Sequence, residues 1–307
     1  MSNVIKQILS NYQSDNAGTK ANLYRILNTG KLSGTGKIVI LPVDQGFEHG
    51  PDRSFCINPD GYDPSYHFKL AIESGLNGYA APLGMIEVGA DEFAGQIPLI
   101  LKMNSNNSLM SGNNNTYQAI TASVDDAVKL GCSAIGFTIY PASDDSLAMY
   151  SEISELAKEA KDKGLAVVIW SYPRGGDLPK EHETSIDVSC YAAHIACLLG
   201  AHIVKVKPPK ATIYDKKVEE AYKKMNIDCS TLSKRVSLVK KSCFNGKRIL
   251  IFSGGESKDD ASLFEEIKQL SLGGANGSII GRNAFQRPFD NAKTMLDKII
   301  SIYKETK

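Results

Sequence analysis

Eight short apolar runs, each followed by a stretch of helical period, constrain the fold of this chain more than any other feature. Their Val, Ile and Leu content is nearly continuous, as in parallel strands that are covered on both faces. The runs occupy residues 37–43, 78–82, 97–104, 134–140, 166–171, 202–207, 248–253 and 277–281. Helical spacing of apolar residues follows over 66–74, 124–130, 146–163, 186–199, 218–225, 261–272 and 291–303. The alternation predicts repeated βα units around a parallel sheet.

Eight such units favour a closed (β/α)8 barrel, or TIM barrel, of the α/β class. An open doubly wound sheet is the alternative, because a strand count does not demonstrate closure. The length of 307 residues accommodates one barrel over residues 37–307. Residues 1–36 carry apolar side chains at helical spacing and are expected to form a helical extension that covers the N-terminal mouth of the barrel. The stretch 104–115, rich in Asn, is expected to be a loop.

The charge balance narrows the possible partners. A formal net charge of +1 argues against nucleic acid and anionic membranes, which require a concentrated basic surface. No apolar stretch reaches the length of about 20 residues that spans a bilayer, and no signal peptide is recognisable. The six cysteines lie far apart without a C-x-x-C pair, which is typical of reduced thiols in a cytoplasmic protein.

In a barrel of this kind the active site lies at the carboxyl ends of the strands. This rule selects a small set of polar residues: Asp44, Glu48, His49, Lys102, Asn104, Trp170, Tyr172, Arg174, Lys205, Lys207, the turn at residues 253–255 and the turn at residues 281–283.

Lys205 stands inside an apolar strand, and burial lowers the pKa of an amine from about 10.4. A neutral amine at a strand end can attack a carbonyl and form a Schiff base, which serves as an electron sink for breaking a carbon–carbon bond. A structural lysine paired with a carboxylate is the alternative. The strand period of two residues places Lys207 on the same side, so the sequence does not separate the two. Lys102 is either a neighbouring cation that depresses the pKa of the nucleophile or the structural partner of Asp44.

Two glycine turns follow the last two strands, where barrel enzymes commonly build a phosphate site. The first is Ser253, Gly254 and Gly255, and the second begins with Gly281 and Arg282. Glycine lets the backbone approach a phosphate, and the guanidinium adds charge-assisted hydrogen bonds. Either turn alone would be read as an ordinary loop, but both together favour phosphate binding.

Three further residues are candidates for handling protons or shaping the site. Tyr172 follows the fifth strand as a general acid or base, and Trp170 faces the same side; alternatively both pack the barrel mouth. Asp44 begins a turn, where a carboxylate either handles a proton or hydrogen-bonds to the loop. The five histidines have no ligand-like spacing, so neither a metal nor another cofactor is expected.

Six motifs in order resemble the archaeal-type class I fructose-bisphosphate aldolases, which also occur in bacteria. They are LPVDQGFEHGP (41–51), GFTIYPAS (136–143), VVIWSYPRGG (167–176), AHIVKVK (201–207), SGG (253–255) and GRNAFQRP (281–288). The resemblance runs from about residue 37 to residue 304.

The resemblance implies a role for each matching residue. Lys205 would form the Schiff base, and Tyr172 would be the principal proton donor and acceptor. Asp44 and Trp170 would shape the reacting end of the substrate. The two glycine turns would hold the phosphate of the dihydroxyacetone phosphate half, and His49 would lie near the site. The implied reaction is the reversible cleavage of fructose 1,6-bisphosphate in glycolysis and gluconeogenesis. Relatives tend to form large rings, so the resemblance also implies a homo-oligomer.

The sequence also departs from the family pattern. Gln45 stands where many relatives carry histidine, and residues 208–247 form a longer, lysine-rich segment. A related Schiff-base enzyme that acts on another phosphorylated keto-sugar, such as an aldol synthase of aromatic precursor biosynthesis, is therefore an alternative. A binding barrel without catalysis is another, but it would predict damage to the lysine, the tyrosine or the turns, and all are intact.

Overall fold

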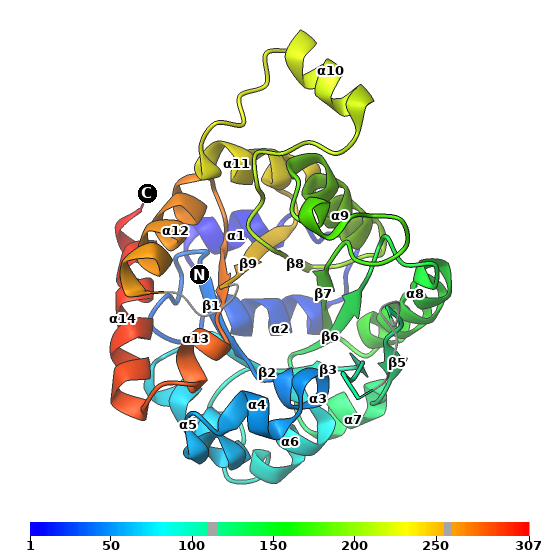
Figure 1. Cartoon of the computed structure of the whole chain (residues 1–307). Helices are drawn as coiled ribbons and strands as arrows, with labels where there is room; N and C mark the ends of the chain where they lie inside the picture. Colours follow the sequence, from blue (N-terminus) through cyan, green and yellow to red (C-terminus); the bar gives the residue numbers. More distant parts are fainter. Residues whose placement is uncertain (110–115, 255–258, 307) are drawn as a thin grey trace.

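A closed barrel of eight parallel strands forms the body of the protein in a computed structural model, which describes residues 1–109, 116–254 and 259–306 (Figure 1). The strands follow one another around the barrel in sequence order, and the last pairs with the first through Ile38 and Gly277. They are β1 (Ile38–Pro42), β2 (Gly78–Pro82), β3 (Leu99–Lys102), β6 (Ala134–Ile139), β7 (Ala166–Ser171), β8 (Ile203–Val206), β9 (Ile249–Ser253) and β10 (Gly277–Ile279). The predicted barrel is confirmed, and the open sheet is wrong.

Helices form a ring around the barrel, and all seven predicted helices are present. They are α5 (Pro64–Glu73), α7 (Val124–Lys129), α8 (Ser146–Asp162), α9 (Ile186–Leu198), α10 (Lys216–Lys224), α12 (Asp260–Leu272) and α14 (Phe289–Glu305). The sequence missed α3 (Gln45–His49), α4 (Pro51–Phe55), α6 (Leu83–Gly89), α11 (Leu232–Ser242) and α13 (Arg282–Phe285), and two 3-10 turns, η1 (Pro59–Tyr62) and η2 (Lys180–His182). Most of these are too short to show a helical period.

The third strand is shorter than expected at both ends, and at its carboxyl end the side chain of Asn104 takes the place of the backbone. Asn104 donates from Nδ2 to the carbonyl of Thr138 at 2.8 Å and accepts the Thr138 N–H on Oδ1 at 2.8 Å. The chain then leaves the barrel as β4 (Asn104–Ser105), which pairs with β5 (Ala119–Ile120). The prediction of a loop over 104–115 is therefore wrong at its start, and residues 110–115 lie outside the described residues.

The barrel interior is layered along its axis. Because strand side chains alternate, residues two apart on one strand face the same side. The lower layer is apolar. Four of its residues each lie two positions before a candidate site residue on the same strand. The pairs are Ile100 and Lys102, Val168 and Trp170, Ile203 and Lys205, and Ile251 and Ser253. A packed apolar floor thus supports the polar layer at the carboxyl ends.

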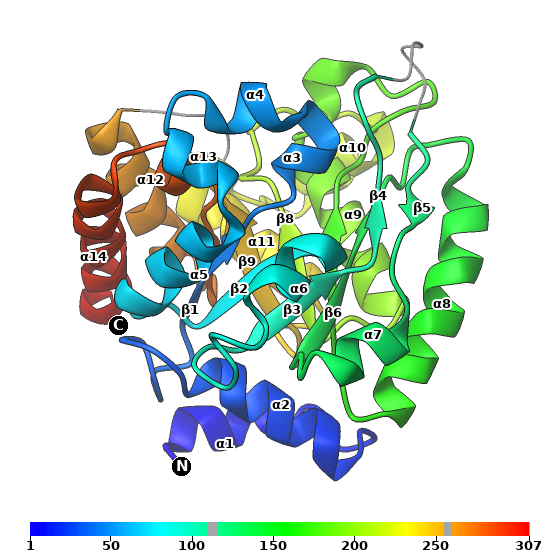
Figure 2. The same ribbon diagram turned by 90° about the horizontal axis from the view of Figure 1, so that it is seen from below.

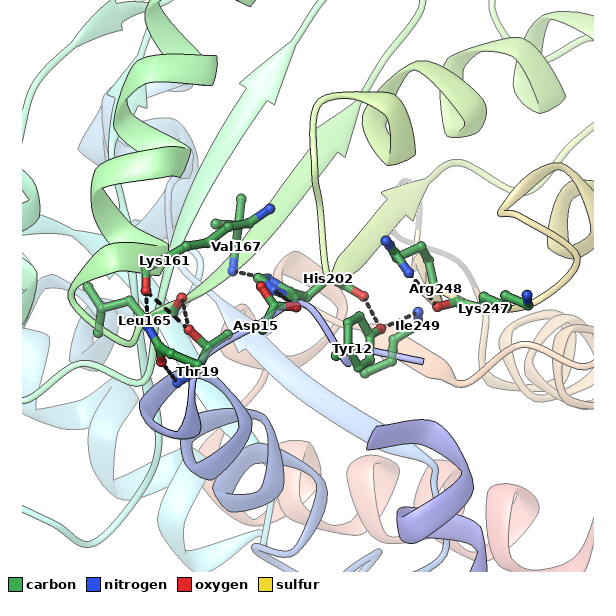
Figure 3. A network of polar contacts seen from close by, with 11 residues as sticks. Tyr12, Asp15, Thr19, Lys161, Leu165, Val167, His202, Lys247, Arg248 and Ile249 are labelled. Carbon is green, nitrogen blue, oxygen red and sulfur yellow. Dashed lines mark hydrogen bonds and ion pairs between the residues drawn. The ribbon is translucent and has the colours of Figure 1, made fainter. Parts of the chain in front are cut away.

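The N-terminal helices lie across the opposite end of the barrel (Figure 2). They are α1 (Asn3–Leu9) and α2 (Ala17–Leu27). Between them, the Tyr12 hydroxyl donates to the carbonyl of His202 at 2.8 Å and accepts from the Ile249 N–H at 3.3 Å (Figure 3). His202 accepts the Val167 N–H on Nδ1 at 2.8 Å, and its Nε2 lies 3.2 Å from the Asp15 carboxylate. These contacts hold the segment to the starts of β7, β8 and β9; the domain boundary at residue 36 stays a prediction.

Two further properties concern the whole described chain. All six cysteines are free thiols. In the described ranges, no helix combines the length and the apolar character that crossing a membrane requires.

Candidate active site

Lys205 lies at the centre of the polar layer, on β8. Its side chain is buried, with 6% of the residue exposed. The ammonium nitrogen lies 5.5 Å from the ring centroid of Trp170 and 5.3 Å from that of Tyr172. Trp170 pairs with Lys205 across β7 and β8, which fixes their relative height. The structure therefore places a buried amine beside two aromatic rings.

Burial is the main reason why the pKa of Lys205 falls to about 8. The carboxylates of Asp44 and Glu48 oppose this fall, because a negative charge stabilises the ammonium. The ammonium groups of Lys102 and Lys207 lower the pKa further by repulsion. About one tenth of this amine is therefore neutral at pH 7, in the form that attacks a carbonyl.

The structure separates Lys205 from Lys207, which the sequence left equivalent. Lys207 forms an ion pair with Glu183, at 3.1 Å between Nζ and Oε2, and about a third of its side chain is exposed. Its ammonium lies 5.7 Å from the centroid of the Tyr172 ring, on the outer side of the site. Lys207 thus has a carboxylate partner and solvent, whereas Lys205 is buried.

Lys102 lies on β3 and is almost fully buried, with 1% of the residue exposed. Its ammonium donates to the backbone carbonyl and to Oδ1 of Asn104. Burial lowers its pKa, and the carboxylates of Asp44 and Glu48 act in the opposite direction. Two roles were expected for Lys102: a cation that lowers the pKa of Lys205, or a structural partner of Asp44. Its charge does lower the pKa of Lys205. Its hydrogen bonds go to Asn104 and not to Asp44.

Tyr172 and Trp170 both contact the site. Burial and the carboxylates of Asp44 and Glu48 raise the pKa of Tyr172 well above its ordinary value, so the phenol keeps its proton. Trp170 needs the space left by Gly136 on β6, where an added Cβ would lie 2.0 Å from Cζ3 of the indole. A glycine thus sets the position of the ring beside the amine.

Asp44 and His49 flank the short helix α3. Asp44 precedes α3 but makes no side-chain capping hydrogen bond, so its carboxylate does not serve as a helix cap. His49 ends the helix, and its pKa is lowered by burial first and then by the charges of Arg53 and Arg282. The imidazole of His49 is therefore neutral near pH 7.

The two glycine turns lie against each other. Asn283 of α13 donates from Nδ2 to the carbonyl of Gly254 at 3.2 Å. Gly281 precedes Arg282, the first residue of α13, and a Cβ on Gly281 would lie 3.0 Å from the carbonyl oxygen of Pro42. The hydroxyl of Ser253 is buried without a hydrogen-bond partner in the part of the chain that the structure describes.

The N–H of Gly254 is bonded to the carbonyl of Ile279 at 3.2 Å, so N–H groups for a phosphate would come from the start of α13, where Arg282 also stands. Gly255, predicted as part of the first turn, lies outside the described residues.

Sequence reasoning missed the roles of several charged neighbours. Burial and the adjacent Asp44 raise the pKa of Glu48. Arg174 stacks over the ring of Tyr140, 5.4 Å from its centroid, and lies 3.7 Å from the Glu183 carboxylate. Glu48 and Arg174 were found at strand ends but without a role, and Glu183 carries no signal in the sequence. Within residues 1–109, 116–254 and 259–306, no group of three or more His, Cys, Asp or Glu side chains is placed to hold a metal ion.

Comparison with known proteins gives this site a context. A profile of the DeoC/LacD family of aldolases matches residues 38–287. The probable fructose-bisphosphate aldolase class 1 of Chlamydia muridarum is 34% identical over 294 residues, covering 92% of this chain and 83% of the relative. The fructose-bisphosphate aldolase class 1 of Thermoproteus tenax is 35% identical over 253 residues, with 82% and 84% covered.

Two more relatives extend the comparison. A Methanocaldococcus jannaschii protein named fructose-bisphosphate aldolase/6-deoxy-5-ketofructose 1-phosphate synthase is 30% identical, over 89% of this chain and 83% of the relative. An archaeal fructose-1,6-bisphosphate aldolase with its catalytic lysine covalently bound to the carbinolamine intermediate superposes with a TM-score of 0.75 at 31% identity, covering 92% of this chain and 99% of the other. The chain belongs to the DeoC/LacD aldolase family and, within it, to the class 1 fructose-bisphosphate aldolases.

Proposed function

We propose that this protein reversibly cleaves fructose 1,6-bisphosphate to dihydroxyacetone phosphate and glyceraldehyde 3-phosphate through a Schiff base on Lys205. The observation that carries the proposal is a buried amine with a pKa of about 8 beside two aromatic rings, on the strand next to the one that ends in Ser253. Membership of the class 1 aldolases supports this reaction.

The neutral amine of Lys205 attacks C2 of the ketose and forms a carbinolamine. Tyr172, which keeps its proton in the resting site, donates it to the carbinolamine hydroxyl, so that water leaves and an iminium forms. The C3–C4 bond then breaks, and its electron pair moves into the iminium as an enamine. The phenolate of Tyr172 takes the proton of the C4 hydroxyl, which becomes the aldehyde oxygen.

The other candidate residues orient the substrate. Trp170 limits the space beside the amine, and Asp44 hydrogen-bonds to a substrate hydroxyl. The turns that contain Gly254 and Gly281, with Arg282, bind the phosphate of the dihydroxyacetone phosphate half. We assign Gly255 to the same turn from its sequence position, and His49 and Lys102 to substrate binding at the rim and the floor of the site.

Borohydride trapping tests the nucleophile directly. Reduction in the presence of fructose 1,6-bisphosphate should leave a three-carbon or six-carbon phosphate adduct on the peptide that contains Lys205. Lys205→Met should abolish the adduct and the activity, whereas the matched variant Lys207→Met should retain the adduct. An adduct on Lys207 or Lys102 in the wild-type protein would show that the wrong amine was chosen.

A second substrate remains a candidate because one 30% identical relative carries two names, for an aldolase and for a 6-deoxy-5-ketofructose 1-phosphate synthase. Comparing kcat/KM for fructose 1,6-bisphosphate with that for other ketose phosphates would decide between the two. We further propose that catalysis needs no metal, that the enzyme acts in the cytoplasm, and that it is a homo-oligomer. Full activity in the presence of a chelator is the expected result.

A further inference from the structure

Gln45, the first residue of α3, is a polar side chain that the proposed mechanism does not use. It follows Asp44 after the carboxyl end of β1, and the residue as a whole is only partly buried. Its Oε1, however, is buried and has no hydrogen-bond partner among the residues that the structure describes. A buried amide oxygen without a partner lowers stability, and proteins retain such groups mainly at functional sites. Gln45 is therefore a candidate for a role in binding.

The nitrogen end of this amide faces the second glycine turn. A Cβ built on Gly281 would lie 3.1 Å from Nε2 of Gln45 and 3.0 Å from the carbonyl oxygen of Pro42. The lack of a side chain at position 281 thus leaves room for the amide beside the backbone that leads into Arg282. Because Oε1 is buried, Nε2 is the end of the amide that a ligand at this turn can reach.

Packing holds α3 against this turn. The helices α3, α4 and α13 lie together at one end of the barrel (Figure 2). The ring of Phe55 in α4 lies 3.4 Å from the position of a Cβ on Gly46, and its centroid lies 5.7 Å from that of the Phe285 ring in α13. The segments that follow β1 and β10 are therefore packed against each other, which fixes Gln45 relative to Gly281.

The charges near α3 suit an anion. Burial lowers the pKa of His49 most, and the guanidinium groups of Arg53 and Arg282 lower it further, so both lie within electrostatic reach of this helix. The carboxylate of Asp44 acts in the opposite direction. Next to these charges, a glutamine amide supplies an N–H donor without adding a charge of its own.

We propose that Gln45 is a substrate-binding residue, whose Nε2 donates a hydrogen bond to the C1 phosphate of the ketose at the turn of Gly281 and Arg282. Gln45 thereby helps to select ketoses that carry a phosphate next to the reacting carbonyl. This inference rests on the proposed function, because it takes the phosphate of the dihydroxyacetone phosphate half to lie at this turn.

The variant Gln45→Met tests the contact, because methionine has a similar length but no donor. KM for fructose 1,6-bisphosphate should rise about tenfold or more through loss of a hydrogen bond to a charged group, while kcat changes little. Thermal stability should not fall, because the buried Oε1 has no partner to lose. A variant with a lower melting temperature and an unaltered KM would overturn the inference, since that is the signature of a structural residue.

The variant Gln45→Glu keeps the shape and replaces the donor with a carboxylate that repels the phosphate. Its KM should exceed that of Gln45→Met. The matched control is Gln96→Glu, on an exposed glutamine that precedes β3 and donates only to the carbonyl of Glu92 at 3.0 Å. This control should leave KM unchanged, and an equal rise in both glutamate variants would overturn a local contact with the phosphate.

Borohydride trapping shows whether the effect belongs to the phosphate. In Gln45→Met, the concentration of dihydroxyacetone phosphate that half-saturates Lys205 should rise about tenfold or more, as KM does. The corresponding concentration of dihydroxyacetone, which has no phosphate, should stay the same. An equal change for both ketones would overturn the contact between Gln45 and the phosphate.

Binding of inorganic phosphate, measured by calorimetry on the full chain, separates this inference from the proposed reaction. Its dissociation constant should rise in Gln45→Met and stay constant in Gln96→Glu. If Lys205 were never trapped in the wild type but phosphate binding still depended on Gln45, the reaction would be wrong and the phosphate contact would stand. If Lys205 were trapped but phosphate bound equally to all variants, or not at all, the role of Gln45 alone would be overturned.

Discussion

The pH dependence of catalysis offers the sharpest test of how the site works. With a pKa of about 8, about one Lys205 side chain in ten is neutral at pH 7, compared with about one in three thousand for an ordinary lysine. Because the neutral amine reacts, kcat/KM should rise about tenfold per pH unit below the pKa of Lys205 and level off above it. This pKa is the midpoint of the pH profile.

Lys102→Met removes a positive charge that lowers the pKa of Lys205. The carboxylates of Asp44 and Glu48 would then act without this opposition, and the midpoint should move to higher pH. A move of one pH unit requires about 1.4 kcal/mol, which Coulomb's law supplies for unit charges about 12 Å apart at an effective dielectric of about 20. We therefore expect the midpoint to move to higher pH and kcat/KM at pH 7 to fall, by up to about tenfold if the shift reaches one unit.

The assay is a pH series of kcat/KM for fructose 1,6-bisphosphate cleavage, with product formation coupled to NADH oxidation. Lys102→Arg keeps the charge and should keep the midpoint. Lys207→Met removes a charge that Glu183 already neutralises in part, so its midpoint should move less. If Lys102→Met lowered the rate equally at every pH and left the midpoint in place, the electrostatic reasoning would be wrong.

Three further predictions follow from packing, phosphate binding and protonation. Gly136→Ala should cost about 1–3 kcal/mol of stability and reduce kcat, because its Cβ would lie 2.0 Å from the Trp170 ring. Arg282→Met should raise KM for the bisphosphate about tenfold or more by removing charge-assisted hydrogen bonds. Burial lowers the pKa of His202, and the contact with His202 lowers that of Asp15, so the unfolded chain takes up protons first on acidification. Stability should therefore fall as the pH drops below about 6.5.

Each of these has a control and a contrary outcome. Gly84→Ala, where a Cβ meets nothing within 4 Å, should leave thermal unfolding and kcat unchanged; an equal loss in both glycine variants would refute the packing argument. If the Arg282→Met enzyme had an unaltered KM, the guanidinium of Arg282 would not bind the phosphate. For the acid effect, the free energy of unfolding can be measured with urea at pH 7 and pH 5. Its loss between the two should be smaller in His202→Gln than in the wild type. Identical losses would show that His202 is not the source of the pH dependence.

The sequence by itself determined the eight strands and the rim that holds the site. Apolar runs and helical spacing are local patterns, so they survive without knowledge of distant contacts. The parity of each strand then places Lys205 on the same side as Lys207, and Trp170 on the same side as Tyr172, but the register that pairs Trp170 with Lys205 comes from the structure. Asn104 marks the limit of this reasoning: its side chain replaces the backbone partner of Thr138, which no run of apolar residues reveals.

The tertiary structure alone decided which lysine is buried and what surrounds it. Lys205 and Lys207 share a strand face, and only the chain after β7 brings Glu183 to one of them. The charges of Asp44 and Glu48 reach the amine from the far side of the barrel. A pKa depends on burial and on charges within several ångströms, and these are set by residues far apart along the chain. The alternation of residues fixes which way a side chain points, but only closure of the barrel fixes what it meets.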